Sequence, residues 1–86
     1  MQIIALYHPQ SDHARRVEDY AHDFQRMHHE TIDLLSLESR EGADMARLYG
    51  ITRYPAIIAR RDGGEMLQIW TDDQMPLMDE VLAYKT

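Results

Sequence analysis

The chain has 86 residues and no cysteine, and its 15 acidic and 9 basic side chains give a formal charge of −6. This length makes a single domain, residues 1–86, with a modest core, and the lack of thiols excludes disulfides, cysteine-ligated metal sites and thiol catalysis. The acidic balance disfavours nucleic acid and anionic membrane surfaces as partners.

The first half of the chain predicts a strand, a helix and a second strand. Residues 2–7 are apolar without polar alternation, as is typical of a strand buried on both faces. After His8-Pro9-Gln10, Ser11 is the expected N-cap of an amphipathic helix that ends near His28 or His29. Residues 31–37 are the expected second strand.

The second half predicts a short helix, a hairpin and a last helix. Ser39 is expected to cap the short helix, and Gly50 to end it in the left-handed conformation. Residues 56–60 and 65–70 predict strands joined by the turn Arg61-Asp62-Gly63-Gly64. Thr71-Asp72-Asp73-Gln74 is expected to cap the last helix, which cannot begin much earlier than Asp72 because Pro76 fits only within the first turn.

The resulting order is β-α-β-α-β-β-α, an α/β class. The right-handed crossover rule makes the first two strands parallel. The glycine turn makes the last two strands antiparallel.

The segment from Tyr49 to Ile58 predicts a helix end, a tight loop and a proline that opens a strand just before a hairpin. Together with the element order, it resembles the cis-proline loop of thioredoxin-like proteins, and this resemblance covers the whole chain. It implies a cis Tyr54–Pro55 bond and a single thioredoxin-like domain with a four-stranded mixed sheet in the order 2-1-3-4. The first and third helices would then cover one face and the second helix the other.

The chemical positions of thioredoxins are empty in this chain. Ser11 and Ala14 occupy the two cysteine positions, and Ala5 falls where those proteins carry a buried acid. The resemblance therefore implies a degenerate member without thiol–disulfide oxidoreductase activity.

Thioredoxins bind extended peptides along the edge where the proline loop, the start of the first helix and the end of the fourth strand meet. The residues that the resemblance places there are His8, Pro9, Ser11, His13, Tyr54, Pro55, Trp70 and Thr71. Tyr54 and Trp70 would supply aromatic area to a groove, unless they serve the core. We predict a non-catalytic module in the cytoplasm that binds a peptide or protein partner at this edge, without a cofactor.

The main alternative is an enzyme that handles glutathione or another thiol ligand, with Ser11 at the helix N-terminus orienting the sulfur. Thr71-Asp72-Asp73 matches the place where glutaredoxins hold the γ-glutamyl group, but the glycine pair of those proteins is missing. The third alternative is an interaction protein similar to the KaiB-type clock proteins, which share the thioredoxin-like core without thiol chemistry.

Two other classes of function have no support in the sequence. The five histidines include no helical pair with a supporting carboxylate, so no metal site is predicted. The N-terminal apolar run is too short for a signal peptide, and no stretch reaches the length of a membrane span. The sequence leaves open the identity of the partner and whether the chain forms homo-oligomers.

Overall fold

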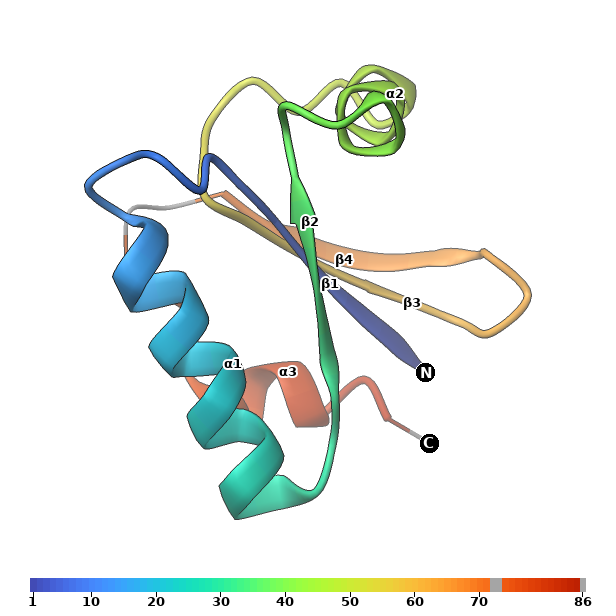
Figure 1. Ribbon diagram of the computed structural model, residues 1–86. Coiled ribbons are helices and arrows are strands. Elements are labelled where there is room, and N and C mark those ends of the chain that lie inside the picture. Colours follow the sequence, from blue (N-terminus) through green and yellow to red (C-terminus); the bar gives the residue numbers. More distant parts are fainter. Residues whose placement is uncertain (72–73, 86) are drawn as a thin grey trace.

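The structure, a computed structural model, describes residues 1–71 and 74–85. Strands and helices follow one another in the predicted order (Figure 1). The elements are β1 (Gln2–Tyr7), α1 (Ala14–His28), β2 (Ile32–Ser36), α2 (Arg40–Leu48), β3 (Ala56–Arg60), β4 (Met66–Trp70) and α3 (Met78–Leu82).

The strands form one mixed sheet in the order β2-β1-β3-β4, which confirms the predicted order. β1 runs parallel to β2 and antiparallel to β3, with Ile4 opposite Ile58. β4 pairs antiparallel with β3, with Ile57 opposite Trp70 and a bulge near Arg60. The turn between β3 and β4 closes through a hydrogen bond from the Gly64 N–H to the Arg61 carbonyl, as expected of the Gly-Gly hairpin.

The sheet separates two apolar clusters, because successive side chains of a strand point to opposite faces. Ile3, Ala5 and Tyr7 of β1 face α1 and α3, whereas Ile4 and Leu6 face α2. β1 is therefore buried on both faces, and the predicted division of the helices, α1 and α3 against α2, is confirmed (Figure 1).

The expected cap of α1 is wrong. The helix begins at Ala14, with His13 at the N-cap position and no capping side chain. The Ser11 hydroxyl donates instead to the carbonyl of His8 at 2.6 Å, and the Ser11 N–H bonds the same oxygen at 3.1 Å. The reason is local: residues 8–11 close a turn on themselves before the helix starts, and this turn uses the Ser11 hydroxyl.

The expected ends of α2 are confirmed. The Ser39 hydroxyl accepts a hydrogen bond from the Gly42 N–H at 3.0 Å, which satisfies one of the free donors of the first turn. Gly50 follows the helix with a φ of 65°, the left-handed conformation that glycine adopts without steric cost. These two residues fix where α2 starts and stops over the sheet.

The expected start of the last helix is wrong. Asp72 and Asp73 lie outside the described residues, and α3 begins only at Met78. Leu77 is extended, with a ψ of 140°, and the carbonyl of the preceding Pro76 accepts a hydrogen bond from the Tyr20 hydroxyl at 2.8 Å. A helix that began before Met78 would use the Pro76 carbonyl in its own hydrogen bonds, but this carbonyl is bonded to Tyr20 instead.

Candidate functional site

The segments that the sequence singles out meet at one end of the sheet. There β1 ends, β3 begins and β4 ends, with Leu6 opposite Ala56 and Ile57 opposite Trp70. Figure 1 shows the loop after β1 beside the loop that enters β3. The structure thus brings the backbone of the predicted site residues together.

The two aromatic side chains nevertheless lie on opposite faces of the sheet. Trp70 packs with the cluster under α1 and α3, edge-on to Tyr84 at 5.7 Å between ring centroids. Tyr54 packs with the cluster under α2. Trp70 follows its strand partner Ile57 to the α1 face, and so the expectation that both aromatics line one groove is wrong.

Tyr54 is held in place by two contacts. Its hydroxyl donates to the carbonyl of Ile51 at 2.7 Å. Its ring meets the His8 ring edge-on, with centroids 5.5 Å apart and an angle of 78° between the planes. A half-buried ring fixed at both ends loses little further freedom when a partner covers it.

His13 closes the loop that carries His8. Its Nε2 atom accepts a hydrogen bond from the His8 backbone N–H at 3.1 Å, so this nitrogen carries the lone pair. The His13 ring lies 6.1 Å from the His8 ring and 6.5 Å from the Tyr7 ring. The two histidines and Tyr54 therefore form one continuous group.

Tyr7 ends this row of rings inside the protein. Its hydroxyl donates to the Glu18 carboxylate at 3.1 Å. Burial, the hydrogen bond and the charge of Glu18 raise the pKa of the Tyr7 hydroxyl above 10.0. Tyr7 thus donates a proton to its bond and does not act as a base near neutral pH.

The remaining predicted site residues have different surroundings. Pro55 is fully buried, and the Tyr54–Pro55 peptide bond is cis. Pro9 and Ser11 are half-buried in the loop before α1, and Thr71 is half-buried directly after Trp70. Pro55 therefore contributes to the conformation of the loop and offers no side-chain surface to a partner.

A hollow of about 440 Å³ opens between α2 and the loop that leads into β3; we call it the Tyr54 hollow. His8 and Tyr54 form its aromatic side, and Leu37, Ala46 and Ile51 give it apolar area. The residues that line it are His8, Leu37, Ala43, Ala46, Arg47, Gly50, Ile51, Thr52 and Tyr54.

Most of this lining was not predicted from the sequence. Ala43 and Ala46 recur at helical spacing and Gly50 follows, a signal that small residues line one face of α2 and its C-terminal end. That signal alone is ordinary packing. The hollow exists only because the loop with Tyr54 lies beside the helix and leaves Ala43 exposed above the buried Ala46, and this is tertiary information.

Polar groups of the lining residue Thr52 and of its neighbour Arg53 have no partner in the described part of the chain. The backbone N–H groups of Thr52 and Arg53 donate no hydrogen bond within residues 1–71 and 74–85. In the same part of the chain, the Arg53 guanidinium has no ion-pair partner, whereas Arg47 pairs with Asp44 on the helix surface. The hollow thus combines apolar area with donors and positive charge.

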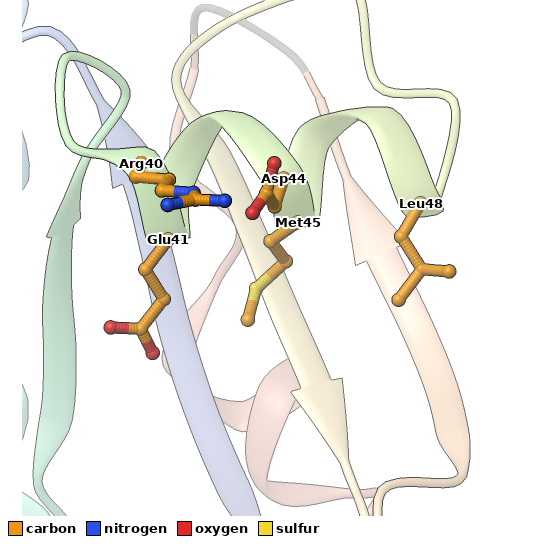
Figure 2. A pocket seen from close by; sticks show the side chains of 5 residues that line it. All are labelled: Arg40, Glu41, Asp44, Met45 and Leu48. Carbon is orange, nitrogen blue, oxygen red and sulfur yellow. The ribbon is translucent and has the colours of Figure 1, made fainter.

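A second hollow, of about 490 Å³, lies along one flank of α2 (Figure 2). Glu41, Met45 and Leu48 leave the helix on the same side, and Leu48 is 73% exposed. Arg40 and Asp44 complete its lining, so every lining residue comes from one helix. Without an opposing wall, this flank is a weaker candidate than the Tyr54 hollow.

Metal-ion sites and membrane-spanning helices are both absent from the described residues. Among residues 1–71 and 74–85, no three histidine or acidic side chains are placed to hold a metal ion. Over the same ranges, no helix has both the length and the apolar character needed to cross a bilayer.

Comparisons of the chain with models of protein families, with curated proteins and with solved structures find no match. We therefore base the function on the residues and geometry of the Tyr54 hollow.

Proposed function

We propose that the chain is a thioredoxin-like domain without thiol chemistry, and that it binds an extended segment of a protein partner in the Tyr54 hollow. The single observation that carries this proposal is the hollow itself, with a fixed aromatic pair beside apolar side chains. The element order and the position of Tyr54-Pro55 just before β3 support the family part of the proposal.

The arrangement suits a peptide better than a globular surface or a polyanion. Peptide recognition in extended form pairs backbone groups of the ligand with free backbone groups of the protein, while a pocket takes one side chain. Thr52 lines the apolar pocket and Arg53 is the next residue, and within the described residues the backbone N–H groups of both are free, which fits this division. The formal charge of −6 disfavours nucleic acid.

We place the protein in the cytoplasm as part of the same proposal, because a small secreted domain usually depends on disulfides and this chain has no cysteine. The chain cannot perform thiol–disulfide exchange with its own side chains. The proposed role is recognition.

The experiment that tests this function is selection of binders from a displayed library of random linear peptides, followed by titration of the selected peptides. Tyr54→Ala removes the aromatic wall, and Ala43→Leu fills the hollow from an exposed helical position without adding strain to the core. We expect each variant to weaken binding about tenfold or more. Tyr54→Ala removes an aromatic anchor, the kind of residue that dominates such interfaces, and Ala43→Leu occupies the space that the ligand side chain needs.

Leu48→Ala is the matched control. Leu48 is a strongly exposed apolar residue of the same helix, but it lines the other hollow. Its replacement should leave the affinity unchanged. Circular dichroism spectra of all variants must overlay that of the parent. If the selected peptides bind Tyr54→Ala and Ala43→Leu as tightly as the parent, the proposed function is wrong.

The alternative, a thiol-ligand enzyme that uses Ser11, has less support. The Ser11 hydroxyl is already bonded to the His8 carbonyl and lies before the helix, not at its N-cap. We expect millimolar glutathione to cause no saturable NMR shifts in the loop that carries Ser11. Saturable shifts there, together with shifts of Tyr54 and Thr71, would favour the enzyme.

A further inference from the structure

The charge around the Tyr54 hollow differs from that of the chain as a whole. The sequence has 15 acidic and 9 basic residues, yet among residues 1–71 and 74–85 no acidic side chain lines this hollow. Arg47 lines it, and Arg53 lies between the lining residues Thr52 and Tyr54. A concave, locally cationic site on an acidic protein indicates a ligand of opposite charge.

We infer that the partner segment is acidic, with one apolar side chain in the hollow and a neighbouring carboxylate that pairs with Arg53. This inference rests on the proposed function and names the chemistry of its ligand.

Arg53 is the natural anchor for this carboxylate. Its guanidinium is exposed and has no ion-pair partner in the described part of the chain. A guanidinium presents its donors in a fork that matches the two oxygens of a carboxylate. No ion pair within the described residues has to break before Arg53 accepts a ligand.

Arg47 can contribute after an exchange of partners. It pairs with Asp44 on the same helix, and its side chain is 75% exposed. Exposed pairs of this kind add little to stability. A ligand carboxylate near the hollow would therefore compete with Asp44 at little cost.

The apolar part of the ligand follows from the lining. Leu37, Ala46 and Ile51 offer aliphatic contacts, and the rings of His8 and Tyr54 form one side. The volume, about 440 Å³, lies within the range of about 300–1,000 Å³ typical of small-ligand pockets. A leucine, isoleucine, methionine or phenylalanine side chain suits this space.

The net charge of the protein does not oppose this pairing at close range. Screening at physiological ionic strength acts over about 8 Å, so distant acidic residues count less than the adjacent arginines. The matching prediction is that positive residues are absent from the ligand next to its apolar anchor.

The test uses peptides selected from the random library, resynthesised in matched forms. In each, the acidic residue beside the apolar anchor is replaced by glutamine or lysine. We expect the selected set to be enriched in Asp and Glu at this position, and the lysine form to bind about three- to tenfold more weakly than the acidic form.

The protein side of the test is charge reversal. Arg53→Glu should weaken binding of the acidic peptide by a similar factor and restore binding of the lysine form. Arg16→Glu is the control, because Arg16 is exposed on α1, has no ion pair in the described part of the chain, and changes the net charge identically. It should leave both affinities unchanged.

The outcomes separate the inference from the function beneath it. If Tyr54→Ala abolishes binding but peptide charge and Arg53→Glu make no difference, the acidic ligand is wrong and the proposed function stands. Equal losses with Arg53→Glu and Arg16→Glu would reduce the effect to net charge and overturn the inference. If no peptide depends on Tyr54, both proposals fail.

Discussion

Gly42 lies directly against the main chain of Ser36: a Cβ atom at Gly42 would stand 1.9 Å from the Ser36 carbonyl oxygen. The same oxygen accepts a hydrogen bond from the Ser39 hydroxyl at 2.7 Å, and that hydroxyl receives the Gly42 N–H. The first turn of α2 is therefore pressed onto the end of β2. This contact sets the position of the helix that forms one wall of the Tyr54 hollow.

Gly42→Ala should strongly destabilise the fold. In an exposed helix the same change stabilises by about 1 kcal/mol, because alanine is the better helix former. Here the added methyl group meets a rigid backbone oxygen, so we expect a loss of about 2 kcal/mol or more in the free energy of unfolding. Urea unfolding monitored by circular dichroism measures it.

Gly63→Ala is the matched control for Gly42→Ala. Gly63 lies in the hairpin turn with open space around its α-carbon, and its φ is not in the left-handed range. The change should cost nothing measurable, within about 0.5 kcal/mol. A Gly42→Ala protein as stable as Gly63→Ala would show that α2 can move away from Ser36.

Two serines with similar sequence settings should respond differently to replacement. Ser39→Ala removes the cap of α2 and should lower the free energy of unfolding by about 1 kcal/mol. Ser11→Ala removes only an exposed hydroxyl bond to the His8 carbonyl and should cost less than half of that. Chemical denaturation of both variants in parallel decides this. A larger loss of unfolding free energy with Ser11→Ala would show that Ser11 does cap α1.

Trp70→Ala should affect stability without affecting peptide binding. The indole packs on the cluster under α1 and α3, away from the Tyr54 hollow. Truncation of a packed aromatic costs about 3 kcal/mol, less here because Trp70 is only half-buried. Titration of a selected peptide at a temperature where the variant is folded should give the parental affinity. Weaker binding would show that Trp70 is part of the binding site.

Features with a local chemical cause were predictable from the sequence. The Ser39 hydroxyl caps α2, Gly50 takes the left-handed conformation, and the Gly63-Gly64 pair turns the hairpin, all within a few residues of their partners. The strand order also followed, because a right-handed crossover and a hairpin leave few arrangements.

Features with a distant cause were not predictable. The start of α3 depends on the bond between Tyr20 and Pro76, which are far apart in the sequence. The face of Trp70 depends on its register with Ile57, which the hairpin sequence alone does not specify. The Tyr54 hollow depends on the position of the loop before β3 relative to α2, and no local sequence pattern encodes that position.

Tyr20 provides a test of the α1–α3 contact through pH. Burial, followed by the charge of Glu80, raises the pKa of the Tyr20 hydroxyl from 10.0 to about 12. Between these two values the unfolded chain has released the Tyr20 proton while the folded chain still holds it. Rising pH therefore favours the unfolded state, and this contribution to stability is lost from about pH 10 to about pH 12.

Tyr20→Phe isolates this effect. At pH values well below 10.0, the ordinary pKa of tyrosine, the parent should be more stable by about 1 kcal/mol, because it keeps the hydrogen bond to the Pro76 carbonyl. As the pH rises from about 10 toward about 12, the parent should lose this advantage, since only the parent has a Tyr20 proton to release on unfolding. All other titratable groups, among them Tyr7 with its raised pKa, are present in both proteins, so their contributions cancel in the difference. Urea unfolding of both proteins at a series of alkaline pH values gives the difference directly, and absorbance of tyrosinate reports the missing ionisation in the variant. A difference in unfolding free energy that stays constant across this range would show that Tyr20 ionises equally in both states, and that α3 does not cover its hydroxyl.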